Sequence, residues 1–260
     1  MILDEICTHK REEVAQRKAA VPLKDLEEAL GQARPARDFR AALRMEGISL
    51  IAEIKKASPT KGILIENVDP VELAAVYESS GARALSVLTD GKYFSGAIED
   101  LVTARQGVKL PCLRKDFVVD EYQIWESRVH SADAILLIVA VLSDQQLEDY
   151  LGLARRLGLA ALVETHTAGE IERALRAEAH IIGVNNRDLN TFEVNVKTTL
   201  ELKKLVPGGN VLVSESGIRT RDHVRQLDDG GVDAILVGEA LVTSGNIPAA
   251  IAGLLGHDES

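Results

Sequence analysis

Cysteine is scarce in this sequence, and long apolar runs are missing. These absences set the first limits on its structure and cellular location. Its two cysteines, Cys7 and Cys112, are too few for a disulfide framework and suit a reducing cytoplasm. The longest apolar runs, such as 134–142, are too short to span a membrane. Residues 1–18 are charged throughout and lack the apolar core of a signal peptide. We therefore expect a cytoplasmic globular protein.

Basic residues are fewer than acidic ones, so the formal net charge is −10. Nucleic acids and anionic membranes attract basic proteins, so neither is expected as a partner. A small anionic substrate is compatible with this balance only if a local group of lysines binds it. We expect a monomer that acts on such a small molecule.

Apolar segments alternate with amphipathic ones along most of the chain. Strands are expected at 48–54, 84–88, 110–114, 134–140, 159–163, 181–185, 211–214 and 234–237. Helices are expected between and after them, at 70–80, 97–105, 121–130, 144–157, 167–177, 197–205, 220–229 and 247–255. Eight such units in 260 residues predict a (β/α)8 TIM barrel. A doubly wound open sheet also alternates, but no Gly-x-Gly-x-x-Gly follows the first strand.

The first 45 residues precede this alternation and have helical periodicity. Leu3, Ile6, the aliphatic stem of Lys10 and Val14 recur at helical spacing, and Pro22 ends that helix. Further helices are expected at 23–30 and 39–45. Residues 1–260 are thus expected to form a single barrel domain, with residues 1–45 as a helical extension that caps one end.

Polar residues end several of the predicted strands on the face that is expected to point into the barrel. Each of them follows apolar residues at alternate positions, and side chains alternate across a strand. The set consists of Glu53, Lys55, Lys115, Glu164, Asn185 and Glu215. At a single strand such charges could simply mark a solvated end. Six in register at the carboxyl ends predict a catalytic mouth, because buried charges must pair or meet a ligand.

The last two strands run into a pattern typical of phosphate sites. Ser216 and Gly217 follow the seventh strand, and Gly238 precedes a short helix that opens at Glu239. Glycines let the backbone approach a ligand, and a helix N-terminus favours an anion. Ordinary strand-to-helix turns are the alternative. His166 and His180 lie too far from a second His or Cys to predict a metal site.

Five segments of the chain resemble the indole-3-glycerol phosphate synthase family of tryptophan biosynthesis. They are 52–62 (AEIKKASPTKG), 113–117 (LRKDF), 162–166 (LVETH), 183–189 (GVNNRDL) and 213–218 (VSESGI). The resemblance covers nearly the whole length, including the helical extension. It implies closure of the indole ring of 1-(o-carboxyphenylamino)-1-deoxyribulose 5-phosphate, with loss of CO2 and water.

The resemblance also implies the roles of the polar residues. Lys115 matches the general acid, Lys55 matches the cation that positions the substrate carboxylate, and Glu164 matches the general base. Either lysine could protonate the hydroxyl that leaves as water. Glu53, Asn185 and Glu215 match a supporting shell. After ring closure the substrate nitrogen is itself an electron sink, so no metal or other cofactor is expected.

The remaining residues matched by the resemblance would bind the two ends of the substrate. The phosphate would lie against Ser216, Gly217, Gly238 and the amide of Glu239, with Ser58 and Lys55 nearby, and Arg187 would lie at the edge of the ring pocket. The ring pocket itself would comprise Phe94, Phe117, Leu136, Leu189 and Leu236, although these residues could equally well pack the barrel.

Two other functions compete with this one. Phosphoribosylanthranilate isomerase is also a phosphate-binding barrel, but that class has Cys or Asp at strand one and lacks the long extension. A non-catalytic barrel that binds a phosphorylated ligand would keep Ser216, Gly217 and Gly238 but would not need Lys55, Lys115 and Glu164.

Overall fold

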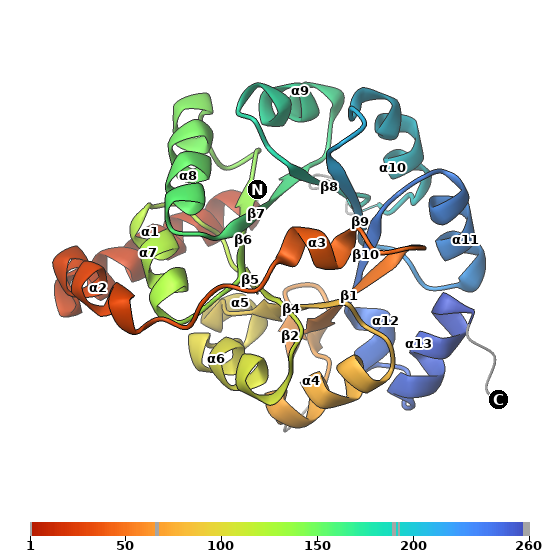
Figure 1. Ribbon diagram of the computed structural model, residues 1–260, viewed down its shortest axis with the longest axis horizontal. Helices are drawn as coiled ribbons and strands as arrows, with labels where there is room; N and C mark the ends of the chain where they lie inside the picture. The colour runs from red at the N-terminus through yellow and green to blue at the C-terminus, as the bar shows by residue number, and fades with distance from the viewer. Residues whose placement is uncertain (1, 66–67, 189–190, 192, 257–260) are drawn as a thin grey trace.

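The computed structural model describes residues 2–65, 68–188, 191 and 193–256. Eight parallel strands close into a barrel in the order β1-β10-β9-β8-β7-β6-β5-β4 (Figure 1). Their bounds are β1 Ser49–Ile54, β4 Ala84–Leu88, β5 Cys112–Lys115, β6 Ala134–Ile138, β7 Ala160–Thr165, β8 Ile181–Asn185, β9 Val211–Glu215 and β10 Ala234–Val237. The predicted (β/α)8 barrel is confirmed, and each predicted strand boundary lies within two residues of the observed one.

Helices surround the barrel on all sides. The helices between and after the strands are α4 Pro70–Ser79, α5 Gly91–Phe94, α6 Ile98–Gly107, α7 Tyr122–Val129, α8 Asp144–Arg156, α9 Ala168–Arg176, α10 Lys197–Leu202, α11 Arg221–Asp229, α12 Glu239–Val242 and α13 Ile247–Leu255. The 3-10 turn η2, Lys203–Leu205, extends α10. Their starts follow local chemistry: Asp69 caps α4 ahead of Pro70, and Ser143 and Gln146 form a capping box on α8.

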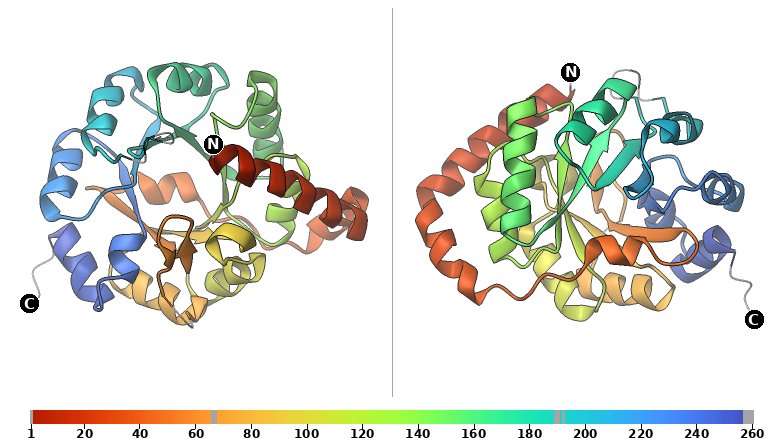
Figure 2. Two further views of the ribbon diagram at one scale, coloured as in Figure 1. Left: turned by 180° about the vertical axis from the view of Figure 1, so that it is seen from behind. Right: turned by 45° about the horizontal axis from the view of Figure 1, so that its top comes forward.

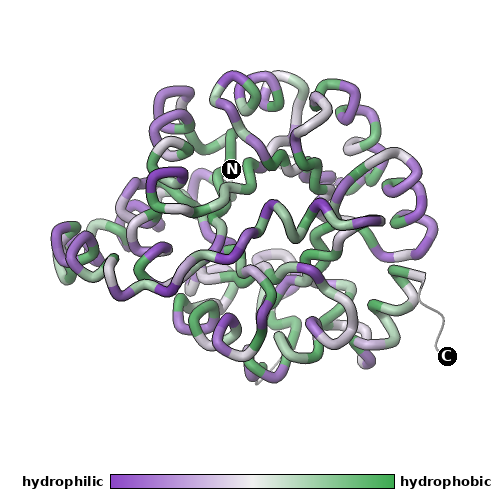
Figure 3. The backbone as a smooth tube through the Cα atoms, in the orientation of Figure 1, coloured by the Kyte–Doolittle hydropathy of each residue, from purple (hydrophilic) through white to green (hydrophobic). Residues whose placement is uncertain are grey.

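Successive residues of each strand point to opposite sides and belong to two apolar layers, one between the strands and the helices and one inside the barrel. Leu50, Ala52 and Ile54 of β1 pack outward against the helices, whereas Ile51 points into the barrel. In Figure 3 apolar colour follows the strands, and polar colour lies on the outer turns of the helices. This alternation places the last inward residue of each strand at the carboxyl-end mouth.

Residues 2–43 form the extension, which comprises α1 Ile2–Ala20, α2 Leu23–Ala29, the 3-10 turn η1 Leu30–Gln32 and α3 Phe39–Leu43. It contacts both ends of the barrel, not one end as predicted. Phe39 and Leu43 of α3 are fully buried and join the interior layer at the amino-end (Figure 1). The opposite view in Figure 2 shows α1 at the carboxyl-end mouth. The chain can reach both ends because η1 and the residues up to 38 run along the outside of the barrel.

A buried ammonium group attaches α1 to the barrel. Lys10 Nζ lies 2.9 Å from Asp90 Oδ2 and 3.0 Å from Asp116 Oδ1, and all three side chains are fully buried. Glu13 on α1 adds a third carboxylate at 2.8 Å. Asp90 also caps α5, and Asp116 directly follows Lys115. Lys10 therefore links the extension to two segments of the mouth.

We predict that Lys10→Met strongly destabilises the protein, because Asp90 loses the cation that it pairs with and Asp116 keeps only Arg114, at 3.0 Å. Removing one partner of a buried ion pair costs about 3–5 kcal/mol, which thermal unfolding would register as a lower Tm. Lys18→Met is the matched control, because Lys18 lies on the same helix in a half-exposed pair with Asp120, and it should cost less than about 1 kcal/mol. Equal losses in the two variants would contradict the assigned importance of Lys10.

Candidate active site

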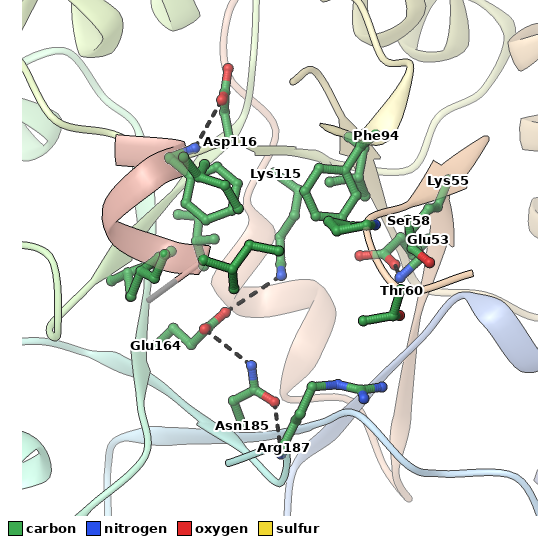
Figure 4. A pocket seen from close by; sticks show the side chains of 18 of the residues that line it. Glu53, Lys55, Ser58, Thr60, Phe94, Lys115, Asp116, Glu164, Asn185 and Arg187 are labelled. Atoms are coloured by element: carbon green, nitrogen blue, oxygen red, sulfur yellow. Dashed lines mark hydrogen bonds and ion pairs between the residues drawn. The ribbon is translucent and has the colours of Figure 1, made fainter. Parts of the chain in front are cut away.

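The inward polar residues of five strands meet at the carboxyl-end mouth of the barrel. They are Glu53 on β1, Lys115 on β5, Glu164 on β7, Asn185 on β8 and Glu215 on β9. Each lies two positions after an interior apolar residue or otherwise continues the inward face of its strand. All but Lys115 and Asn185 are almost fully buried. The close-up in Figure 4 shows four of them around one pocket, together with Lys55. The structure thus brings together the polar residues that the sequence placed on one face.

Lys115 lies between two carboxylates. Its Nζ is 3.5 Å from Glu164 Oε2 and 3.5 Å from Glu215 Oε2. Burial lowers the pKa of Lys115, but the neighbouring carboxyl groups, Glu164 most of all, raise it above its ordinary value. The ammonium is therefore charged at neutral pH, and it points toward the pocket (Figure 4).

The two carboxylates beside Lys115 differ in their protonation. Burial raises the pKa of Glu164. Lys115, His166 and a hydrogen bond from Asn185 lower it by more than burial raises it, so the pKa lies below its ordinary value and the group is ionised. Asn185 Nδ2 donates to Glu164 Oε1 at 3.1 Å (Figure 4). Burial and the negative charge of Glu164 raise the pKa of Glu215 to about 8. One carboxylate is thus ready to accept a proton and the other holds one at neutral pH.

Lys55, the residue that follows β1, forms a separate ion pair with Glu53 of that strand. Its Nζ lies 2.7 Å from Glu53 Oε1, and its side chain is 20% exposed against 4% for Glu53. Tyr77 Oη donates a hydrogen bond to the backbone carbonyl of Glu53 at 3.1 Å, which fixes the strand end. The ammonium group of Lys55 therefore faces the pocket from the wall opposite Glu164 (Figure 4).

One end of the pocket is apolar. Phe94 and Phe117 have ring centroids 6.1 Å apart, and Leu136 lies beside them in the lining. Ile2, Leu3 and Ile6 of α1 line the same end, together with Leu88 and Ile138. The helical spacing identified Leu3 and Ile6 as one face of a helix, but only the fold shows that this face covers the pocket. Leu189 lies outside the described residues.

The other end is polar and adjoins Ser216, Gly217, Gly238 and Glu239. Gly217 has φ +81°, and a Cβ there would meet Val194 Cγ1 at 2.2 Å, so any other residue would strain the backbone and displace Val194. A Cβ on Gly238 would lie 2.5 Å from Glu53 Oε1, so this glycine leaves room for the first-strand carboxylate. Leu236 lines this polar hollow and packs in the same interior layer as Leu136, and its place beside the ring stays a prediction.

Two cations that the sequence reasoning did not assign hold Glu239. Its Oε1 lies 2.6 Å from Lys61 Nζ and 2.9 Å from Arg219 Nη2. Lys61 belongs to a small hairpin, β2 Ala57–Ser58 and β3 Gly62–Ile63, which also carries Ser58 into the pocket. Arg187 lines both the apolar and the polar parts.

The described residues contain no group of three or more His, Cys, Asp or Glu side chains arranged to hold a metal ion. In the same part of the chain, no helix has the length and hydrophobicity that a membrane span requires.

The fold and the charged mouth define a (β/α)8 barrel with a cluster of ionisable side chains at the carboxyl ends of its strands, where enzymes of this fold have their active sites. The sequence profile described as "Indole-3-glycerol phosphate synthase" matches residues 3–254. The chain belongs to the indole-3-glycerol phosphate synthase family. This confirms the resemblance seen in the sequence and the enzyme class, a carboxy-lyase of tryptophan biosynthesis.

Curated relatives agree with this assignment over almost their full length. The chain is 50% identical to an indole-3-glycerol phosphate synthase of Roseiflexus sp., over 98% of each chain. It is 48% identical to that of Dehalococcoides mccartyi, over 98% of this chain and 100% of the relative.

Solved structures at lower identity share the fold. A mutant tryptophan synthase alpha-subunit from Pyrococcus furiosus superposes with a TM-score of 0.62 at 16% identity, covering 82% of this chain and 100% of the other. Thiamine phosphate pyrophosphorylase from the same organism gives 0.61 at 18% identity, covering 82% and 95%. At these identities the similarity extends to the barrel alone.

We predict that Glu215→Gln makes the protein more resistant to unfolding at pH 9. The unfolded side chain ionises near 4.5 and the folded one at about 8. Unfolding between these values releases a proton, so Glu215 costs stability as the pH rises through this window. The variant cannot ionise, so its Tm relative to wild type should rise from pH 5 to pH 9, by about 2–4 °C for each kcal/mol removed.

The exposed residue Glu172 supplies the control, because Glu172→Gln should leave the difference in Tm independent of pH. A Glu215→Gln variant whose Tm tracks that of wild type from pH 5 to pH 9 would rule out a proton on Glu215 at neutral pH.

Proposed function

We propose that this protein is an indole-3-glycerol phosphate synthase in which Lys115 is the general acid and Glu164 the general base. The substrate is 1-(o-carboxyphenylamino)-1-deoxyribulose 5-phosphate. The observation that carries the assignment is the single ammonium group between Glu164 and Glu215, in a pocket with one apolar and one polar end. The two ends match an aromatic ring and a phosphate.

The two ends of the substrate differ in the same way as the two ends of the pocket. The carboxyphenyl ring is placed against Phe94, Phe117 and Leu136, with Arg187 at its edge. The phosphate is placed beside Ser216, Gly217 and Gly238, where α12 begins. The first N–H groups of a helix have no partner within it and favour an anion. The ribulose chain then crosses the mouth beside Lys115.

Ring closure needs a cation at the ketone oxygen. The ring carbon that bears the carboxylate attacks the ketone, and negative charge develops on the oxygen. Lys115 is charged, and an alkoxide is more basic than an amine, so the proton moves from Nζ to oxygen. Lys55, which is paired with Glu53, attracts the substrate carboxylate and folds the chain toward attack.

Decarboxylation then uses the substrate's own electrons. Ring closure leaves an iminium at the nitrogen, and the electron pair of the breaking C–C bond returns to it as CO2 leaves. The protein needs only to hold the intermediate in a water-poor pocket, which the apolar residues of α1 help to close.

Dehydration completes the indole. Glu164 removes a proton from the carbon next to the nitrogen, and the hydroxyl leaves as water after protonation by Lys55 or Lys115. Glu164 is ionised and accepts a hydrogen bond from Asn185, so it is oriented and ready to act as a base. Glu53 and Glu215 hold the two lysines in place, and Ser58 supports the phosphate from the first loop.

A monomeric state and a cytoplasmic location stay predictions from the sequence. Both cysteines are free and buried, in keeping with a reducing compartment.

Lys115→Met should lower kcat by at least ~10²-fold, because it removes the proton donor of ring closure. Fluorescence of the indole product, followed without added metal, measures the rate. Lys109→Met is the control, since Lys109 is exposed and remote from the pocket. A variant at Lys115 that retains most of its activity would move the acid role to Lys55.

Gly217→Ala should weaken phosphate binding, because the left-handed backbone and the contact with Val194 both oppose a Cβ. We expect KM and the inhibition constant of inorganic phosphate to rise together by ~10-fold, or about 1.4 kcal/mol. Gly169→Ala, on α9 with open space around it, should change neither constant. Unchanged inhibition by phosphate in Gly217→Ala would remove the polar end as the phosphate site.

A further inference from the structure

Glu239 is an ionised carboxylate at the end of the pocket where the substrate phosphate is placed. It lines both the apolar and the polar part of the pocket. Burial raises the pKa of Glu239, but the hydrogen bond from Lys61 and the charges of Lys61, Arg219 and Lys55 lower it below its ordinary value. A phosphate beside this carboxylate is repelled unless cations lie between the two groups.

Among the described residues, two other carboxyl groups line the polar hollow, and neither opposes an anion as directly. They are Glu53, which pairs with Lys55, and Glu215, which holds a proton at neutral pH. Glu239 directly follows Gly238, which is placed against the phosphate. Its charge therefore bears most directly on phosphate binding.

Lys61 and Arg219 both bind the same oxygen of Glu239. Lys61 Nζ lies 2.6 Å from Oε1 and Arg219 Nη2 lies 2.9 Å from it. One cation comes from the β2–β3 hairpin and the other from the segment between β9 and α11. One negative charge thus holds two positive charges, which leaves an excess of positive charge here in a protein whose formal net charge is −10.

Glu239 occupies only part of the hydrogen-bonding capacity of each cation. An ammonium group has three N–H donors and a guanidinium group has five. The side chains of Lys61 and Arg219 are 50% and 60% exposed, so their charged ends can turn toward a ligand without leaving a packed environment. Phosphate oxygens are strong acceptors that suit both kinds of cation.

Both cations adjoin residues that are already placed against the phosphate. Arg219 lies two residues after Gly217 and lines the same polar hollow. Lys61 donates a hydrogen bond from its backbone N–H to Ser58 Oγ at 3.2 Å, and Ser58 lines the pocket. Three separate segments of the chain therefore converge on the polar end, and two of them contribute a positive charge.

We propose that Lys61 and Arg219 bind the substrate phosphate, and that Glu239 competes with the phosphate for both of them. The inference rests on the proposed function. In the free protein Glu239 keeps the two cations at the polar end. When the phosphate binds, their N–H groups turn from the carboxylate oxygen to phosphate oxygens. A substrate without a phosphate leaves the pairing with Glu239 intact, so the exchange favours a phosphorylated substrate.

Calorimetric titration with inorganic phosphate tests the two cations without any turnover. Lys61→Met and Arg219→Met should each raise the Kd of phosphate by ~5-fold, the effect of a partly exposed charge contact. Lys61→Arg keeps the charge and should stay within about twofold of wild type. Arg225→Met and Lys24→Met remove exposed cations that form other ion pairs, and they should leave the Kd unchanged.

The decisive comparison removes the competing carboxylate. Glu239→Gln should lower the Kd of phosphate by ~5-fold, because both cations become available to the ligand. Lys61→Met or Arg219→Met made in this background should still raise the Kd by ~5-fold. If the cations served only to neutralise Glu239, their removal would have no effect once the carboxylate is gone. The KM of the phosphorylated substrate should follow the Kd of phosphate across these variants.

Three results would overturn the inference: no measurable binding of phosphate to the wild-type protein, no gain in affinity in Glu239→Gln, or an unchanged Kd when either cation is removed in that background. Failure of the wild-type protein to form the indole product would instead remove the proposed function. The phosphate titrations would still decide whether Lys61 and Arg219 bind the anion.

Discussion

The pairing of one ammonium with buried carboxylates at the mouth of the barrel is the interaction on which the rest of the site depends. Lys115, Glu164 and Glu215 cannot all be charged in a dry pocket without a high cost in free energy. The fold meets this by ionising Glu164, leaving a proton on Glu215 and charging Lys115. That distribution provides an acid and a base 3.5 Å apart at neutral pH.

The extension completes the pocket that the barrel begins. The apolar residues of α1 line the aromatic end, and Lys10 attaches the helix to the barrel beneath it. Asp116 accepts a hydrogen bond from the backbone N–H of Phe117 and also binds Lys10. Asp90 caps α5, which carries Phe94. Lys10 thus links α1, which covers the pocket, to the segments that carry Phe94 and Phe117.

Alternation in the sequence was sufficient to predict the barrel and the inward face, because a period of two determines which side chains share a face. It could not predict how deep along the barrel each inward residue lies, so it did not show that Leu236 lines the polar hollow. The β2–β3 hairpin was missed because two-residue strands show no periodicity. Lys10 was correctly placed on the inner face of α1, but its carboxylate partners are distant in sequence. The pairing of Glu239 with Lys61 and Arg219 was missed for the same reason, since each partner lies 20 or more residues away in the sequence.

The most direct test measures CO2 release and indole formation in parallel, in single turnovers of Lys115→Met and Glu164→Gln. If Lys115 acts before decarboxylation and Glu164 after it, the lysine variant releases neither product at a normal rate. The glutamate variant then releases CO2 in a burst while indole fluorescence lags. Equal delays of CO2 and indole in both variants would contradict the division of labour between the acid and the base.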